Sequence, residues 1–239
     1  HEVTASMSAQ MHGCDVIDGM GTSHEHDQGV NRMNKTHQLV LGVLAASMAS
    51  IAFAQTPAPT AAPAVNAATV TQRNANQQER IEQGLKSGEL NTKEAARLER
   101  EEAHVDHVEA QAMKDGTMTA AEKARVTKAQ NQVSQDINKE KHDAQKGNPN
   151  SASSERMQAA VQRDANQQQR IANGVKDGSL TNHEVSGLER GQAHDSRVEA
   201  RAGADGHVSA AESKHVQNTE NRQSNRVARK KHNARERAN

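Results

Sequence analysis

Two short segments of this 239-residue chain carry carboxylates at a spacing that could serve a divalent cation. Asp115 and Glu122 enclose the stretch Gly-Thr-Met-Thr-Ala-Ala, and Asp205 and Glu212 enclose the similar stretch Gly-His-Val-Ser-Ala-Ala. Carboxylate and main-chain carbonyl oxygens are the ligands that Ca²⁺ takes in proteins. The pattern also has a structural meaning, because Gly can end a helix, Thr or Ser can cap the next one, and Glu three positions later completes a capping box. We therefore expect structural turns, with weak calcium binding as the alternative.

The turn around Gly116 resembles the second half of an EF-hand loop, in which Gly, an aliphatic residue and Glu stand at the sixth, eighth and twelfth positions. Gly116, Met118 and Glu122 match these positions. The first and third positions, which carry Asp or Asn in that family, are Gln111 and Met113 here. The resemblance implies calcium as the cation, and the departures predict that it is not bound tightly.

Two histidines offer a second arrangement with the spacing of metal ligands. His104 and His107 lie one helical turn apart, with Asp106 between them and Glu109 nearby. Such a pair can present imidazoles to zinc or copper. Arg197 stands at the position equivalent to His107 in the second copy of a repeat described below, so we expect a solvated helix surface here.

The C-terminal segment is strongly basic. Its acidic residues are Glu220 and Glu236, and its cationic residues are Arg222, Arg226, Arg229, Lys230, Lys231, Arg235 and Arg237. A basic helix can bind the phosphates of anionic lipid or nucleic acid. Nucleic acid is the less favoured partner, because the segment has no aromatic side chain for base stacking. The simplest interpretation is a solvated tail, with polyanion binding as the alternative.

Composition argues against catalysis. Cys14 is the only cysteine, and the chain has no Trp or Tyr and a single Phe. The chain also has no Gly-x-Ser-x-Gly nucleophile motif and no phosphate-binding loop. We predict a non-enzymatic protein without a cofactor.

A tandem duplication organises most of the chain. Residues 70–145 align with residues 160–235 without a gap, so each residue of the first copy has a counterpart 90 positions later. Weaker forms of the turn pattern occupy 87–94 and 177–184. The fold class that follows is all-α, with two tandem repeats of about three helices joined by tight Asp-Gly and Ser-Gly turns. The expected helices cover roughly 70–85, 92–113, 120–144, 160–175, 182–203 and 210–234.

The apolar stripes of these helices are thin. Spacings of three, four and seven place two sets on single helical faces; these are Leu98, Val105, Val108 and Ala112, and then Val126, Val133 and Ile137. Asp195 and Gln223 replace two of these residues in the second copy. We expect a slim Ala/Val/Leu seam of low stability, stabilised by a partner or by self-association.

The N-terminal region divides into three parts. Residues 33–54 have the basic start, apolar run and small-residue end of a secretory signal peptide, with cleavage expected after Ala54. Residues 1–32 are then interpreted as upstream, non-native sequence and as disordered, and residues 55–69 as a Pro/Ala-rich tether. We place the repeats at 70–146 and 160–239, with a linker at 147–159.

The duplication as a whole is similar to a group of uncharacterised exported proteobacterial helical-repeat proteins. Its recurring Asn-Gln-Gln, Leu-Glu-Arg, Asp-Gly and Lys-His segments carry that resemblance. It implies a periplasmic or secreted protein but no activity. The function expected from the sequence is that of an envelope interaction or structural module. Weak divalent-cation binding by the turns and polyanion binding by the C-terminus are the alternatives.

Overall fold

The computed structural model describes residues 66–233, which are entirely helical apart from turns. The helices are α1 (Ala67–Ser87), α2 (Thr92–Ala112), α3 (Ala120–Lys141), α4 (Ala152–Lys176), α5 (Asn182–Ala202) and α6 (Ala210–Lys231). The all-α fold with three helices in each repeat confirms the prediction. The predicted signal peptide, its cleavage site and most of the tether lie outside the described residues. No described helix has the length and apolar character needed to cross a membrane.

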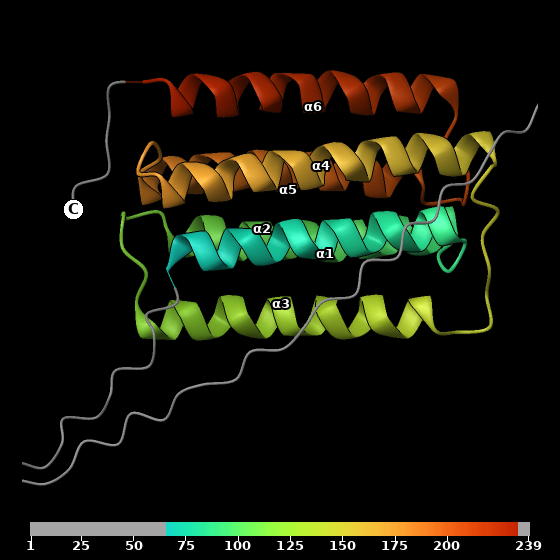
Figure 1. The fold of residues 1–239 in the computed structure, drawn as a ribbon, viewed down its shortest axis with the longest axis horizontal. Coiled ribbons are helices and arrows are strands. Elements are labelled where there is room, and N and C mark those ends of the chain that lie inside the picture. The colour runs from blue at the N-terminus through green and yellow to red at the C-terminus, as the bar shows by residue number, and fades with distance from the viewer. Residues whose placement is uncertain (1–65, 234–239) are drawn as a thin grey trace, which may run out of the picture. The chain divides into compact units, whose positions relative to one another are not determined.

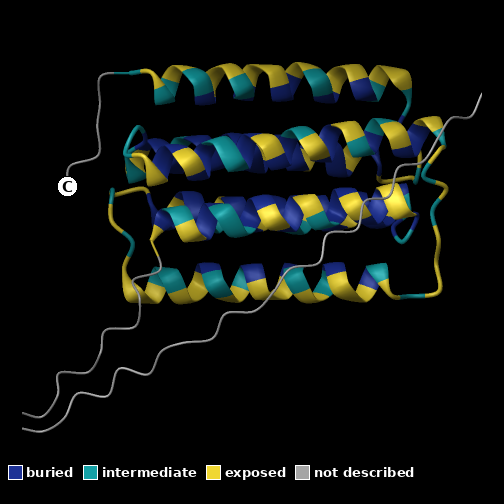
Figure 2. Ribbon diagram, viewed as in Figure 1, coloured by how far each residue is buried: buried dark blue, intermediate teal, exposed yellow. Residues whose placement is uncertain are grey.

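Four helices form a shared central bundle. α1 packs along α4, and α2 packs along α5, so the main contacts join one repeat to the other. Both pairs are antiparallel, and α3 covers α1 and α2 on one side while α6 covers α4 and α5 on the opposite side (Figure 1). Figure 2 shows that α3 and α6 each bury only one face, whereas the four central helices are buried over much more of their surface.

The turns between helices have the predicted capping chemistry. Capping boxes join Asn91 to Glu94, Thr119 to Glu122, Thr181 to Glu184 and Ser209 to Glu212. The glycine of each turn has a positive φ, between 75° and 91°. A side chain would resist that backbone conformation, which explains why all four copies of the pattern retain Gly.

Two predicted boundaries are wrong. α4 begins at Ala152, so the predicted linker 147–159 is too long. Ser151 caps α4 by accepting a hydrogen bond from the Ser154 amide at 3.1 Å, and the first turns of α4 bury Met157. α1 likewise begins at Ala67, inside the predicted tether, because Asn66 accepts a hydrogen bond from the Thr69 amide at 2.9 Å. In both cases a polar capping residue starts the helix before the first expected apolar residue.

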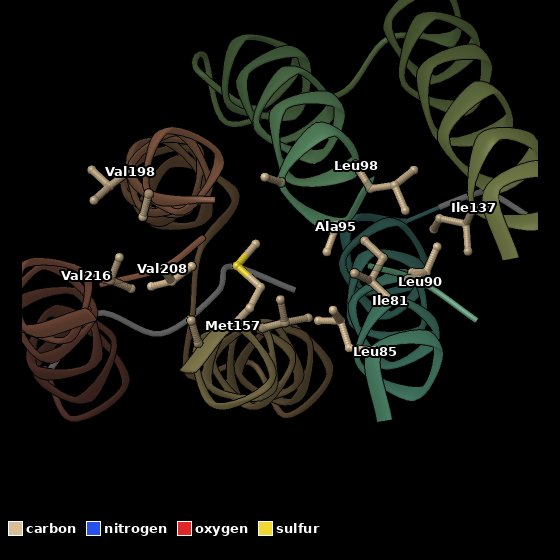
Figure 3. Packing of buried hydrophobic residues seen from close by; sticks show 14 of the residues in the cluster. Ile81, Leu85, Leu90, Ala95, Leu98, Ile137, Met157, Val198, Val208 and Val216 are labelled. Atoms are coloured by element: carbon tan, nitrogen blue, oxygen red, sulfur yellow. The ribbon is translucent and has the colours of Figure 1, made fainter. Parts of the chain in front are cut away.

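The apolar core is divided between the two ends of the bundle. One cluster includes Ile81 and Leu85 from the C-terminal part of α1 and Met157 from the N-terminal part of α4 (Figure 3). A second cluster includes Ile171 and Val175 from the C-terminal part of α4. Because α1 and α4 are antiparallel, these clusters lie toward opposite ends. Polar and charged residues are nearly as numerous among the buried residues as hydrophobic ones, and many of them lie between the clusters.

Candidate metal centre

An acidic stripe on α2 faces the interior of the bundle. Glu99, Glu102, Asp106 and Glu109 follow one another at spacings of three, four and three residues, which places them on one helical face. All four are buried, with at most 1% of their surface exposed. The equivalent stripe on α5 contains Glu189 and Glu199, which are fully buried as well. Acidic residues are rarely buried completely unless they are paired or bind a metal.

These acids gather into two groups of three. Triad 1 consists of Glu99 from α2, Asp164 from α4 and Glu199 from α5. Triad 2 consists of Asp106 and Glu109 from α2 and Glu189 from α5. Each residue of a triad offers one carboxylate oxygen that lies within 4.8 Å of those offered by the other two. Both triads therefore draw on both repeats.

The duplication relates the triads to each other. Glu99 and Glu189 are counterparts, and so are Glu109 and Glu199, so each triad has one glutamate of each kind. The aspartate is exchanged between two positions. Triad 1 takes Asp164, which accepts a hydrogen bond from Ser196 at 3.4 Å. In the first repeat, Asn74 is the counterpart of Asp164, and Asp106 is the counterpart of Ser196. The Asn74 amide donates a hydrogen bond to Asp106, the aspartate of triad 2, at 3.2 Å.

Amide side chains hold one oxygen of several triad carboxylates. In triad 1, Gln78 donates to Glu99 at 3.0 Å. In triad 2, the Gln168 amide donates to both Asp106 and Glu189 at 3.0 Å, and Gln130 donates to Glu109 at 2.9 Å. These donors fix the carboxylate orientations and leave other oxygens available.

The remaining triad oxygens are buried without a hydrogen-bond donor. In triad 1 these are Glu99 Oε1, Asp164 Oδ1 and both oxygens of Glu199; in triad 2 they are Asp106 Oδ2, Glu109 Oε2 and Glu189 Oε1. Among residues 66–233, no Lys or Arg forms an ion pair with a triad carboxylate. Such oxygens require either protons or a cation.

Burial controls the protonation of the triads. Loss of hydration raises the pKa of Glu99 from 4.5 to about 7, and it raises the pKa of Glu189 to about 7 as well. Burial, reinforced by neighbouring carboxylates, raises the pKa values of Asp106, Glu109, Asp164 and Glu199 well above their usual range. The triads can consequently exist in two states, a set of protonated acids and a set of cation ligands.

The ligand chemistry favours a hard cation. Each triad offers carboxylate oxygens, and its nearest polar neighbours are amide and hydroxyl groups, with no histidine or cysteine in either triad. Oxygen-only sites suit Ca²⁺, Mg²⁺ and Mn²⁺ better than zinc or copper.

The carboxylates of a third acidic group, which consists of Glu94, Glu140 and Asp143, already have partners within the protein. There Glu94 accepts from the Asn91 amide at 2.9 Å, and Glu140 pairs with Arg97 at 3.1 Å.

The four carboxylates singled out in the sequence serve the turns. Asp115 accepts from the Thr117 amide at 3.0 Å, and Glu122 accepts from the Thr119 amide at 2.8 Å. Asp205 accepts from the His207 amide, and Glu212 from the Ser209 amide, both at 2.8 Å. Hydrogen bonds to these groups lower the pKa values of Asp115, Glu122 and Glu212. Their carboxylates thus already have donors, unlike the free oxygens of the triads.

The other predicted candidates lie on the surface. His104 and His107 are exposed, and the His107 ring makes a 2.8 Å hydrogen bond with Gln111, while Asp106 between them points into the core. In the basic segment, Lys230 pairs with Glu184 and Lys231 with Asp177, each at 3.7 Å. Arg222, Arg226 and Arg229 are exposed on α6, and Arg235 and Arg237 lie outside the described residues.

Sequence reasoning missed the triads because it defined the buried face of the second helix by its apolar residues, and it considered Asp106 and Glu109 only as neighbours of the His104–His107 pair. The repeated segments Leu-Glu-Arg and Val-Glu-Ala each contain a triad glutamate next to an aliphatic residue. The signal that could have found them is the helical spacing of the acids on the second helix of each repeat.

A scan of protein-family models, a search of curated proteins and a search of solved structures found no match to this chain.

Proposed function

We propose that this protein is a non-enzymatic helical module that binds hard divalent cations in the centre of its four-helix bundle. One observation carries the proposal: six buried carboxylates form two triads in which seven oxygens have neither a donor nor an ion-pair partner. Burying charged carboxylates without a hydrogen-bond donor or a counter-ion costs free energy. A bound divalent cation in each triad would neutralise most of that charge.

The export expected from residues 33–54 is compatible with this role, and we keep an envelope location as part of the proposal. Oxygen-only sites suit hard divalent cations better than zinc or copper, and extracellular modules are among the proteins that bind calcium through such sites. Interaction with an envelope partner stays as the broader function within which cation binding would operate.

Calorimetric titration of the full chain with Ca²⁺, Mn²⁺ and Mg²⁺ at pH 7.5 tests the proposal. We expect two binding events for at least one cation, with dissociation constants of about 10 μM or below, the range of sensor-type calcium sites. The double substitution Glu99→Gln with Glu199→Gln should remove one event, and Glu109→Gln with Glu189→Gln should remove the other.

The matched control is Glu122→Gln with Glu212→Gln, which changes the same residue type in the turns. It should leave both binding events in place. If the wild type binds none of the three cations, or if only the turn variant loses binding, the core is not a cation site.

A further inference from the structure

A groove on the first repeat has the dimensions and lining of a ligand site. It encloses about 610 Å³ between α2 and α3, within the range of about 300–1,000 Å³ that is typical of small-molecule pockets. Its apolar lining comes from Val108 and Ala112 on α2 and from Ala129 and Val133 on α3. The groove is separate from the triads, because the triad residues of α2 face the bundle interior and none of them lines it.

Cationic side chains that form no ion pair in the described residues border these apolar residues. Arg100, Arg125 and Lys128 line the groove and are exposed. None of the three forms an ion pair with another residue in the described range 66–233. The two carboxylates of the lining are engaged elsewhere, since Glu101 lies 3.4 Å from Arg97 and Glu122 is held in the capping box. The groove therefore has three cationic side chains against two carboxylates beside an apolar floor, and Glu122 offsets part of the charge of Arg125.

The second repeat shows what closes the equivalent groove. The hollow between α5 and α6 encloses only about 140 Å³. Gly191 and Gln223 stand there at the positions of Glu101 and Val133, and the Gln223 amide packs directly over Gly191, where a Cβ atom would overlap it. Gln223 is held in that position because it donates to the Leu188 carbonyl at 2.8 Å. The cations are reduced as well, since His215 and Asn218 replace Arg125 and Lys128.

We propose that the α2–α3 groove of the first repeat binds a single-chain amphiphile with an anionic head, such as a fatty-acid-like carboxylate. The aliphatic tail lies along Val108, Ala129 and Val133. The head is held by Arg125 and Lys128, which are neighbours one turn apart on α3. Charge complementarity and the apolar floor together select this ligand class over a neutral or cationic amphiphile.

Calorimetric titration of the full chain with laurate, below its micelle concentration, tests the proposal. Dodecyltrimethylammonium has the same tail with a cationic head, and butyrate has the same head with almost no tail. We expect one laurate per chain and at least about tenfold weaker binding of both comparison compounds, because each lacks one of the two recognised features. Comparable binding of either one would overturn the proposal.

Two variants locate the site. Glu101→Gly with Val133→Gln copies the closed second repeat, and Arg125→Glu with Lys128→Glu reverses the head-binding charges; each should weaken laurate binding at least about tenfold. The control Arg226→Glu with Arg229→Glu reverses two exposed cations at the same spacing on α6 and should bind as the wild type does. Circular dichroism establishes that each variant is helical. Laurate binding retained by both groove variants would place the ligand elsewhere.

Discussion

Triads 1 and 2 have the same architecture but different surroundings. Near triad 1, Glu220 and Asp195 add further buried acids, and Arg163 pairs with Glu220 at 2.5 Å. Near triad 2, the counterparts of those acids are Gln130 and Val105, and the Gln130 amide donates to a triad carboxylate. One scaffold thus holds a site rich in charge and a site rich in amide donors. The difference predicts that triad 1 depends more strongly on a cation than triad 2.

The largest expected effect is an inverted dependence of stability on pH. The raised pKa values of Glu99 and Glu189 mean that the folded chain holds protons that the unfolded chain releases between pH 4.5 and about 7. The free energy of unfolding without cations should therefore fall as pH rises through this interval. We expect the melting temperature to drop by about 10 °C between pH 5 and pH 8.

Circular dichroism at 222 nm measures this change, since the chain has no Trp or Tyr for fluorescence. Saturating Ca²⁺ or Mn²⁺ should remove most of the drop, because the cation replaces the lost protons. The substitution Glu99→Gln with Glu189→Gln should make the drop smaller without abolishing it, because burial also raises the pKa values of the other four triad carboxyls. A melting temperature that rises with pH over this interval would contradict the assignment.

A smaller effect is expected from exchanging the aspartates. Asp164→Asn removes one of the three carboxylates of triad 1 and should weaken one of the two cation sites at least about tenfold. Adding Ser196→Asp to this variant rebuilds the arrangement of triad 2, with an amide at one position and an aspartate at the other. The double variant should recover cation binding in calorimetry. Asp195→Asn is the control, because Asp195 is buried nearby but belongs to neither triad. If the double variant does not recover cation binding, the two halves are not interchangeable.

The smallest effect should come from the turns. Thr119→Ala and Ser209→Ala each remove a capping side chain whose oxygen accepts the amide of Glu122 or Glu212 at 3.2 Å. Each should cost about 1 kcal/mol, or about 2–4 °C in melting temperature, with no change in cation affinity. Equal losses in the two variants would show that the turns, unlike the triads, are equivalent. A loss of cation binding would instead return the turns to consideration as metal sites.

Local signals in the sequence predicted the helices well and the interior poorly. Gly116 and the capping residues Thr119 and Glu122 act within a few positions of each other, so the pattern alone determines the turn. The buried position of Glu99 depends on α5 and on Asp164 in α4, which are distant in the sequence. A glutamate on a helix is normally solvated, and only the packing of two repeats against each other brings these acids together.

The groove illustrates the same limit. The sequence shows that Val133 and Gln223 are counterparts of unequal hydrophobicity. Whether this difference closes the groove depends on Gly191, whose missing side chain leaves room for the Gln223 amide. A pair of residues on different helices therefore determines whether the groove of a repeat is open or closed.

The reciprocal amide pair between Gln72 of α1 and Gln169 of α4, at 2.7 and 3.0 Å, joins the first repeat to the second just as the triads do. A lone copy would hold only one or two of the three carboxylates of each triad, and completing the triad would require an encounter between two molecules. The short segment between Lys141 and Ala152 makes that encounter intramolecular, with an effective concentration in the millimolar range that is typical of short linkers. Occupancy of the proposed cation sites would consequently be insensitive to dilution of the protein, and the two halves would be free to diverge in sequence because they would not have to serve as identical partners.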